Sequence, residues 1–120
     1  IWESIMHITD YKLNNVIAIV DRNRLSVTDV ITDNAVFKLL PVALKHLGWF
    51  YKEIDGHSFQ ECLAVLNEAK ISNKPSFIIA NTIKGKGLSF AENNNKFHHT
   101  VLTKSLYDKA LEEIKKLKFH

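Results

Sequence analysis

The pattern of apolar and polar positions predicts helices alternating with strands along most of the chain. Apolar residues recur at helical spacing in four segments, residues 1–11, 35–47, 59–70 and 104–117. Short apolar runs bounded by turn residues, typical of strands, occupy residues 16–20, 49–55 and 76–82. This alternation indicates right-handed crossovers between parallel strands. We therefore predict an α/β fold, a parallel sheet with helices on both of its faces.

Five residues mark the expected ends of the helices. Ser58 and Thr103 carry hydroxyl groups that can cap the helices following them, and Asn34 (or the aspartate before it) is the expected cap of the second helix. Gly48 is expected to end that helix. Pro41 lacks an amide proton, so we expect it to separate a short turn from the second helix proper.

Two apolar patterns predict burial. The run at residues 16–20 suits a strand that is covered on both faces, as strands of parallel sheets usually are. On the third helix, the residues expected to face the core are Phe59, Cys62, Leu63, Val65, Leu66 and Ala69. Cys62 is therefore read as a core residue and not as a nucleophile.

Composition and charge narrow the class of protein. The chain has 120 residues, of which 46% are hydrophobic and 24% charged, and a formal net charge of +3, too small to indicate a nucleic-acid partner. A single cysteine excludes an internal disulfide framework, and no apolar run is long enough to span a membrane, so we expect a cytoplasmic protein. The first residues read as the body of an element that began earlier, so we expect residues 1–120 to be an N-terminally truncated part of a domain.

Oxygen donors follow the first predicted strand. Asp21 and Asn23 stand at its carboxyl end, where ligands bind in parallel sheets, and the carbonyl of Leu25 is close in sequence. Carboxylate, amide and carbonyl oxygens are the ligands that magnesium and calcium prefer. A polar turn that caps a buried strand is the other interpretation of these residues.

The stretch "TIKGKGLSF" follows the third predicted strand and opens a long loop. Gly85 and Gly87 can let the backbone approach a ligand, while Lys84 and Lys86 supply positive charge, so phosphate is the expected ligand. The spacing matches neither a Walker loop nor a dinucleotide fingerprint, and a simple turn remains an alternative.

Two adjacent histidines, His98 and His99, lie later in the same loop. Imidazoles there can contact phosphate or transfer protons, although surface histidines often do neither. The spacing of cysteine and histidine does not indicate a zinc site.

Three motifs in order resemble one family. They are "KLNNVIAIVDRNRLS", "GWFYKEIDGHSF" with "KPSFIIANTIKGKGLSF", and "ENNNKFHH". Together they resemble transketolase, in the N-terminal domain that holds the diphosphate of thiamine diphosphate, and the resemblance covers residues 1–102. It implies a thiamine diphosphate-binding fold, a Mg²⁺ or Ca²⁺ ion, and transfer of a two-carbon ketol unit between sugar phosphates.

The resemblance also assigns roles to five positions. Asn23 matches the asparagine whose side-chain oxygen binds the metal, and Leu25 matches the residue that gives it a backbone carbonyl. Ile83 matches a residue that packs on the thiamine ring system, and Lys84 a basic residue near the diphosphate. His98 matches the histidine that contacts the diphosphate and acts catalytically at the reacting end of the substrate.

The chain departs from the family pattern at two places. It has "FHH" where the family usually has "WHG", so His99 replaces a glycine beside the substrate. The Gly-Asp-Gly segment, whose aspartate is the charged metal ligand, is absent from these residues. Glu3 matches a glutamate near the subunit interface of the family, although it could equally lie on a solvated helix face.

The resemblance implies a larger assembly. The expected partner is a pyrimidine-binding domain or C-terminal transketolase subunit, in a homo- or hetero-oligomer, and we expect this chain to be inactive alone. Two alternatives stay open: a transketolase-like subunit of another sugar biosynthetic pathway, and a degenerate, non-catalytic subunit that only binds a partner.

Overall fold

The computed structural model describes residues 1–25 and 35–117 of the chain. They fall into two compact units. The first unit comprises Ile1–Arg22 and Asp33–Thr82, and the second comprises Asn23–Thr32 and Ile83–His120.

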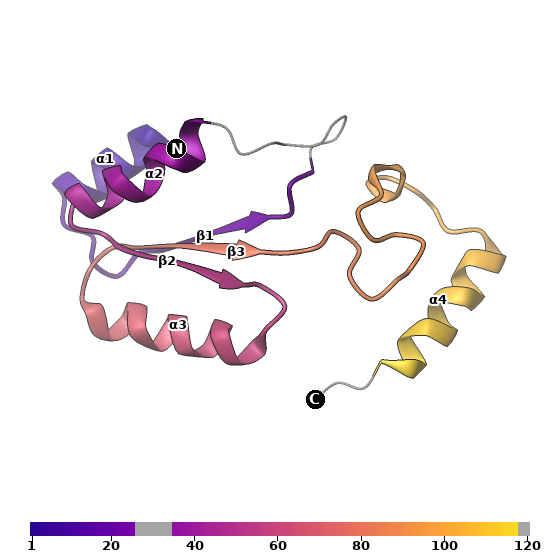
Figure 1. Ribbon diagram of the computed structural model, residues 1–120. Helices are drawn as coiled ribbons and strands as arrows, with labels where there is room; N and C mark the ends of the chain where they lie inside the picture. The colour runs from indigo at the N-terminus through magenta and orange to yellow at the C-terminus, as the bar shows by residue number, and fades with distance from the viewer. Residues whose placement is uncertain (26–34, 118–120) are drawn as a thin grey trace. The chain divides into compact units, whose positions relative to one another are not determined.

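A parallel three-stranded sheet forms the centre of the first unit (Figure 1). Its strands are β1 (Ile17–Arg22), β2 (Phe50–Asp55) and β3 (Ser76–Asn81), in the order β1-β3-β2. The predicted parallel sheet is therefore confirmed. Both outer strands pair with β3 in parallel, so the carboxyl ends of all three strands lie at one edge of the sheet. Asn81 lies opposite both Arg22 and Asp55 there.

Helices lie on both faces of this sheet, as predicted. Figure 1 shows α1 (Trp2–Asp10) and α2 (Ala35–His46) on one face and α3 (Phe59–Ser72) on the other. The buried cluster under the first pair consists of Ile5, Leu40, Leu44, Trp49, Phe77 and Ile79. The indole N–H of Trp49 donates to the Thr9 hydroxyl at 2.8 Å, so the polar atom of this aromatic residue is satisfied.

The prediction that Pro41 divides the second helix is wrong, since α2 runs through it. Leu40 and Leu44 are both buried on one side of α2, and this burial offsets the backbone hydrogen bond that proline cannot make. Gly48 follows the helix with φ +80°, which confirms its predicted role at the helix end. The expected cap at Asn34 or Asp33 lies outside the described residues.

Coverage of the second sheet face differs from the prediction. In α3, Phe59 is 74% exposed and Leu63 65% exposed, and Val65 and Ala69 alone are buried among its described residues. Ile19 of β1 is 59% exposed on the same face. The prediction of a strand covered on both faces is therefore wrong for β1, because in the described sheet β1 is an edge strand and α3 packs beside β2.

The cap of α3 and the environment of its cysteine follow the sequence more closely. Ser58 accepts a hydrogen bond from the amide of Glu61, as its predicted capping role requires. Cys62 is half-buried, with its sulfur 3.9 Å from the carbonyl oxygen of Gly56.

The described part of the second unit consists of residues 23–25, the loop after β3, a short 3₁₀ helix η1 (Asn95–Phe97) and the helix α4 (Lys104–Lys116). Thr103 caps α4 through the amide of Leu106, as predicted. Ala110 is buried, whereas the charged side of the helix is exposed. Across residues 1–25 and 35–117, no helix is both long and apolar enough to cross a membrane.

Candidate cofactor-binding site

The ends of β1 and β3 are tied together by polar groups. The amide of Thr82 donates to the Arg22 carbonyl at 3.2 Å, and the Thr82 hydroxyl donates to the carboxylate of Asp21. Asp21 therefore has a structural partner in the first unit. Asn23 and Ile83 directly follow these two neighbouring strands, so the two candidate segments start from one edge of the sheet.

A short turn organises the predicted metal ligands. The side-chain oxygen of Asn23 accepts a hydrogen bond from the amide of Leu25 at 3.0 Å, and Arg24 between them has φ +60°. This side-chain turn fixes the Asn23 amide relative to the backbone at Leu25. The two residues predicted to bind the metal, Asn23 and Leu25, are therefore held close together by this hydrogen bond.

These donors fit a magnesium or calcium ion as part of a ligand set. Amide and carbonyl oxygens suit hard divalent cations, and magnesium usually completes its shell with water and substrate phosphates. Within the described residues, no three histidine, cysteine, aspartate or glutamate side chains form a cluster that could hold a metal alone.

The loop after β3 closes on itself. The amide of Asn93 donates to the Lys84 carbonyl at 2.9 Å, and the amide of Gly87 donates to the carboxylate of Glu92 at 3.0 Å. Gly85 has φ +74°, and a Cβ added there would lie 2.5 Å from the Ala91 carbonyl oxygen. Gly85 is therefore required for the closure of the loop, and the approach of a ligand to the backbone at the two glycines stays a prediction.

Lys84 and His98 meet at the base of this loop. The Lys84 Nζ lies 3.0 Å from the His98 Nδ1, and the His99 ring stands edge-on to the His98 ring with centroids 4.5 Å apart. The Lys84 ammonium lowers the pKa of His98 below its ordinary value, with smaller contributions from burial and from His99. A positive centre beside a neutral imidazole can bind an anion and exchange a proton with it.

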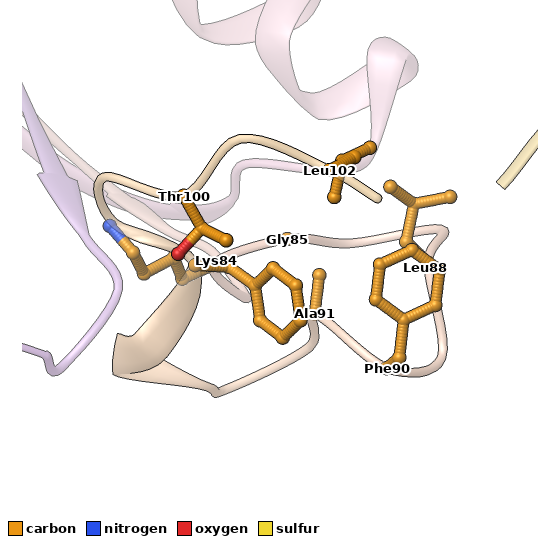
Figure 2. Close-up of a pocket in the computed structure, with 8 residues that line it drawn as sticks. Lys84, Gly85, Leu88, Phe90, Ala91, Thr100 and Leu102 are labelled. Atoms are coloured by element: carbon orange, nitrogen blue, oxygen red, sulfur yellow. The ribbon is translucent and has the colours of Figure 1, made fainter. Parts of the chain in front are cut away.

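A cavity of about 320 Å³ lies within the second unit (Figure 2). Its lining is mostly apolar and comprises Lys84, Gly85, Leu88, Phe90, Ala91, Phe97, Thr100 and Leu102. Figure 2 shows the amino group of Lys84 extending away from Leu88 and Phe90, with the Thr100 side chain beside it. The charge thus stands at one end of an apolar hollow.

Residues 2–118 match the family described as the transketolase, thiamine diphosphate binding domain. The chain belongs to this transketolase family. The fold agrees, because the transketolase of Campylobacter jejuni subsp. jejuni NCTC 11168 superimposes with a TM-score of 0.82 and 28% identity, over 99% of this chain and 19% of that one.

Curated relatives of two kinds are similar to this member of the transketolase family. The 6-deoxy-6-sulfo-D-fructose transketolase subunit SqwG of Clostridium sp. strain MSTE9 is 33% identical over 97% of this chain and 42% of its own length. An apulose-4-phosphate transketolase subunit of Phocaeicola vulgatus is 32% identical over 95% of this chain and 41% of its own. Human transketolase is 32% identical, and the chain spans 18% of its length.

The five residues that the transketolase resemblance singled out all lie in the second unit. Lys84 and His98 are brought into contact, and Asn23 and Leu25 share a turn. Ile83 is half-buried directly after Thr82, and its packing on a ring system stays a prediction. Glu3, in contrast, lies in the first turn of α1 in the first unit and is exposed.

One polar network at the strand ends was missed by sequence reasoning. The Arg22 Nη1 lies 3.4 Å from both the Glu53 carboxylate and the Asn81 side-chain oxygen, and its guanidinium lies 5.0 Å from the centroid of the Phe37 ring. The Tyr51 hydroxyl donates to Glu53. Burial, followed by this glutamate, raises the pKa of Tyr51. Alternation along residues 50–55 could have indicated that Tyr51 and Glu53 share a face, but the strand order was needed to bring Arg22 to them.

Proposed function

We propose that this chain supplies the diphosphate- and metal-binding side of a thiamine diphosphate-dependent transketolase, which transfers a two-carbon ketol unit between sugar phosphates. The observation that carries the proposal is the 3.0 Å contact between the Lys84 ammonium and the His98 imidazole, in the loop after β3 of a chain of this family. The pentose phosphate pathway and the cytoplasm are the setting that we propose for this activity.

The charges of this pair suit a diphosphate. Lys84 carries the positive charge, and its repulsion of a second proton keeps His98 neutral at physiological pH. A diphosphate placed beside the two groups would screen that repulsion, so His98 would regain affinity for a proton. This coupling favours anion binding at Lys84 and prepares His98 to hold a proton near the substrate oxygens.

The remaining predicted residues complete the proposed site. Asn23 would give its side-chain oxygen and Leu25 its carbonyl to a Mg²⁺ or Ca²⁺ ion, which would link the protein to the diphosphate. Ile83 would pack on the thiamine ring system. When bound, thiamine diphosphate supplies the chemistry that carries the ketol unit, while the protein binds and orients it.

A partner completes the enzyme in this proposal. The chain spans about two-fifths of the length of the curated subunits that it matches, 42% and 41%. We propose that a pyrimidine-binding domain or C-terminal transketolase subunit provides the other half of the site in a homo- or hetero-oligomer, and that this chain is inactive alone. The subunit names of these relatives support such an assembly.

A second candidate is supported by the same names. Two of the relatives are subunits for a sulfo-fructose and for apulose 4-phosphate, so the sugar can differ between members of similar sequence. The presence of His99 beside His98 favours a difference at the substrate end of the site.

The test is product formation by the full chain together with its C-terminal partner, with thiamine diphosphate and Mg²⁺. We expect ketol transfer from ketose phosphates to aldose phosphates, detected by mass spectrometry, and its loss in Lys84→Met and His98→Asn. Lys86→Met is the matched control, because Lys86 is an exposed lysine two residues away in the same loop. Cofactor binding without transfer to any sugar phosphate would favour another substrate. No cofactor binding by the assembly would favour the non-catalytic subunit and overturn the proposal.

A further inference from the structure

The helix α4 carries none of the residues proposed for cofactor binding. It is nevertheless hydrogen-bonded to the loop after β3, which carries Lys84 and His98. The Glu113 carboxylate accepts two hydrogen bonds from Ser89, one from its amide at 2.7 Å and one from its hydroxyl at 2.6 Å. Lys109, one turn earlier, places its Nζ 3.7 Å from Glu113 and 5.4 Å from the centre of the Phe90 ring. The tip of the loop is therefore anchored to a helix 24 residues away in sequence.

The anchored tip is connected to Lys84. The amide of Leu88, next to Ser89, donates to the Gly85 carbonyl at 3.2 Å, and the amide of Asn93 donates to the Lys84 carbonyl at 2.9 Å. A shift of Ser89 would therefore move the backbone that carries Lys84.

The same tip is connected to His98. The Asn94 side chain donates to the Phe90 carbonyl at 3.2 Å, and its oxygen caps η1 by accepting from Lys96 at 3.1 Å. The Phe90 and Phe97 rings pack with centroids 5.3 Å apart, and His98 follows Phe97 directly. Both partners of the Lys84–His98 contact are thus attached to the segment that Glu113 holds.

Glu113 is suited to this role by its ionisation. The Ser89 hydroxyl, followed by the Ser89 amide, holds the pKa of Glu113 below its usual value. The carboxylate therefore stays charged through the physiological range, and hydrogen bonds to a charged acceptor are stronger than those between neutral groups. Its side chain is 22% exposed.

We propose that Glu113 is a positioning residue of the cofactor site: by holding Ser89, it keeps Lys84 and His98 at contact distance. The proposal rests on the proposed function for its biological meaning, since the pair that it positions is the pair we assign to the diphosphate. The positioning itself is a property of the protein without ligand.

The test compares Glu113→Ala with Glu112→Ala in the full chain, without cofactor. Both changes remove one negative charge from α4, and Glu112 is exposed. Alanine favours helix at least as well as glutamate, so α4 should persist, which far-UV circular dichroism checks. The readout is the pKa of His98, followed by NMR of ¹³C-labelled histidines and assigned with His98→Asn.

We expect Glu113→Ala to raise the pKa of His98 toward its ordinary value, because Lys84 moves away. Loss of a nearby negative charge by itself would lower the pKa of a histidine, so the two effects have opposite signs. Glu112→Ala is expected to leave the pKa unchanged or slightly lower. Glu113→Gln keeps one acceptor oxygen for Ser89, so it should raise the pKa of His98 by an intermediate amount. This variant provides the test if Glu113→Ala does not fold. A pKa that stays or falls in Glu113→Ala with α4 intact overturns the proposal.

A second readout separates this proposal from the proposed function. Inorganic pyrophosphate with Mg²⁺ is titrated into each protein, and Glu113→Ala should weaken binding roughly tenfold, as expected for lost hydrogen bonds to a charged group. If the unaltered protein assembled with its partner does not bind pyrophosphate, the proposed function fails, while the shift in His98 would still establish the positioning role.

Discussion

Replacement of Gly85 by alanine tests whether the loop after β3 has the closed form that brings Lys84 to His98. Gly85 has φ +74°, and an added Cβ would lie 2.5 Å from the carbonyl oxygen of Ala91. The left-handed backbone costs an alanine about 1–2 kcal/mol. The contact with a backbone oxygen requires the loop to shift, at a further cost of about 1–3 kcal/mol by analogy with overpacked sites.

Gly48 provides the matched control. It also has a positive φ, +80°, but a Cβ added there would meet nothing within 4 Å. Gly48→Ala therefore carries only the backbone cost of about 1–2 kcal/mol. It should lower the stability of the first unit and leave the loop unchanged.

The assay is native-state hydrogen exchange at the amide of Asn93, which donates to Lys84 within the loop. A destabilisation of about 2 kcal/mol or more corresponds to a loss of protection of roughly 30-fold or more. We expect this loss in Gly85→Ala, together with weaker binding of thiamine diphosphate, and normal protection in Gly48→Ala. Unchanged protection of Asn93 in Gly85→Ala would refute the closed loop and the reasoning from it.

Three further predictions concern the first unit. Leu44→Ala should lower the free energy of unfolding by about 2–5 kcal/mol in chemical denaturation, because Leu44 is fully buried; a loss below about 1 kcal/mol would contradict the core. Thr9→Val should cost about 1–3 kcal/mol and shift tryptophan fluorescence, because the Trp49 N–H loses its acceptor; a neutral effect would mean that another acceptor replaces it. Burial and Glu53 raise the pKa of Tyr51, so its neutral form contributes stability that is present below about pH 10 and lost as pH rises through the folded pKa. In urea unfolding between about pH 9 and 11, the free energy of unfolding of the unaltered protein should therefore fall more steeply with pH than that of Tyr51→Phe. Equal slopes for the two proteins would contradict this explanation.

The sheet was predictable because its signals are local. Apolar runs at residues 17–20 and 76–80 are too short for helices and are separated by helical periods, which indicates parallel crossovers. The cap at Ser58 and the glycine at position 48 could also be recognised from one residue type and its neighbours. The strand order could not, because β3 inserts between β1 and β2 and no local pattern encodes that choice.

Helix faces were predicted less well, for a physical reason. Phe59 and Leu63 have helical spacing and apolar side chains, but they are exposed, because apolar periodicity does not say which neighbour covers a face. At Pro41 the sequence predicted a break in the second helix, but α2 continues through it. Burial of Leu40 and Leu44 outweighs the low helix propensity of proline.

The sequence proposed candidate site residues one by one but could not predict their arrangement in space. Lys84 and His98 are 14 positions apart, and their contact depends on a loop closed by Glu92 and Asn94, which no periodicity reveals. The anchor at Glu113 lies further still along the chain, on a helix whose pattern indicates only an amphipathic surface.

The most direct test of the central claim is the pKa of His98 before and after thiamine diphosphate and Mg²⁺ are added to the full chain assembled with its partner. In the free protein, the Lys84 ammonium holds this pKa below its ordinary value. If the diphosphate binds between these groups, its negative charge must raise the pKa of His98, and the rise must disappear in Lys84→Met but persist in Lys86→Met. A cofactor that binds tightly while the pKa of His98 stays unchanged would contradict the account.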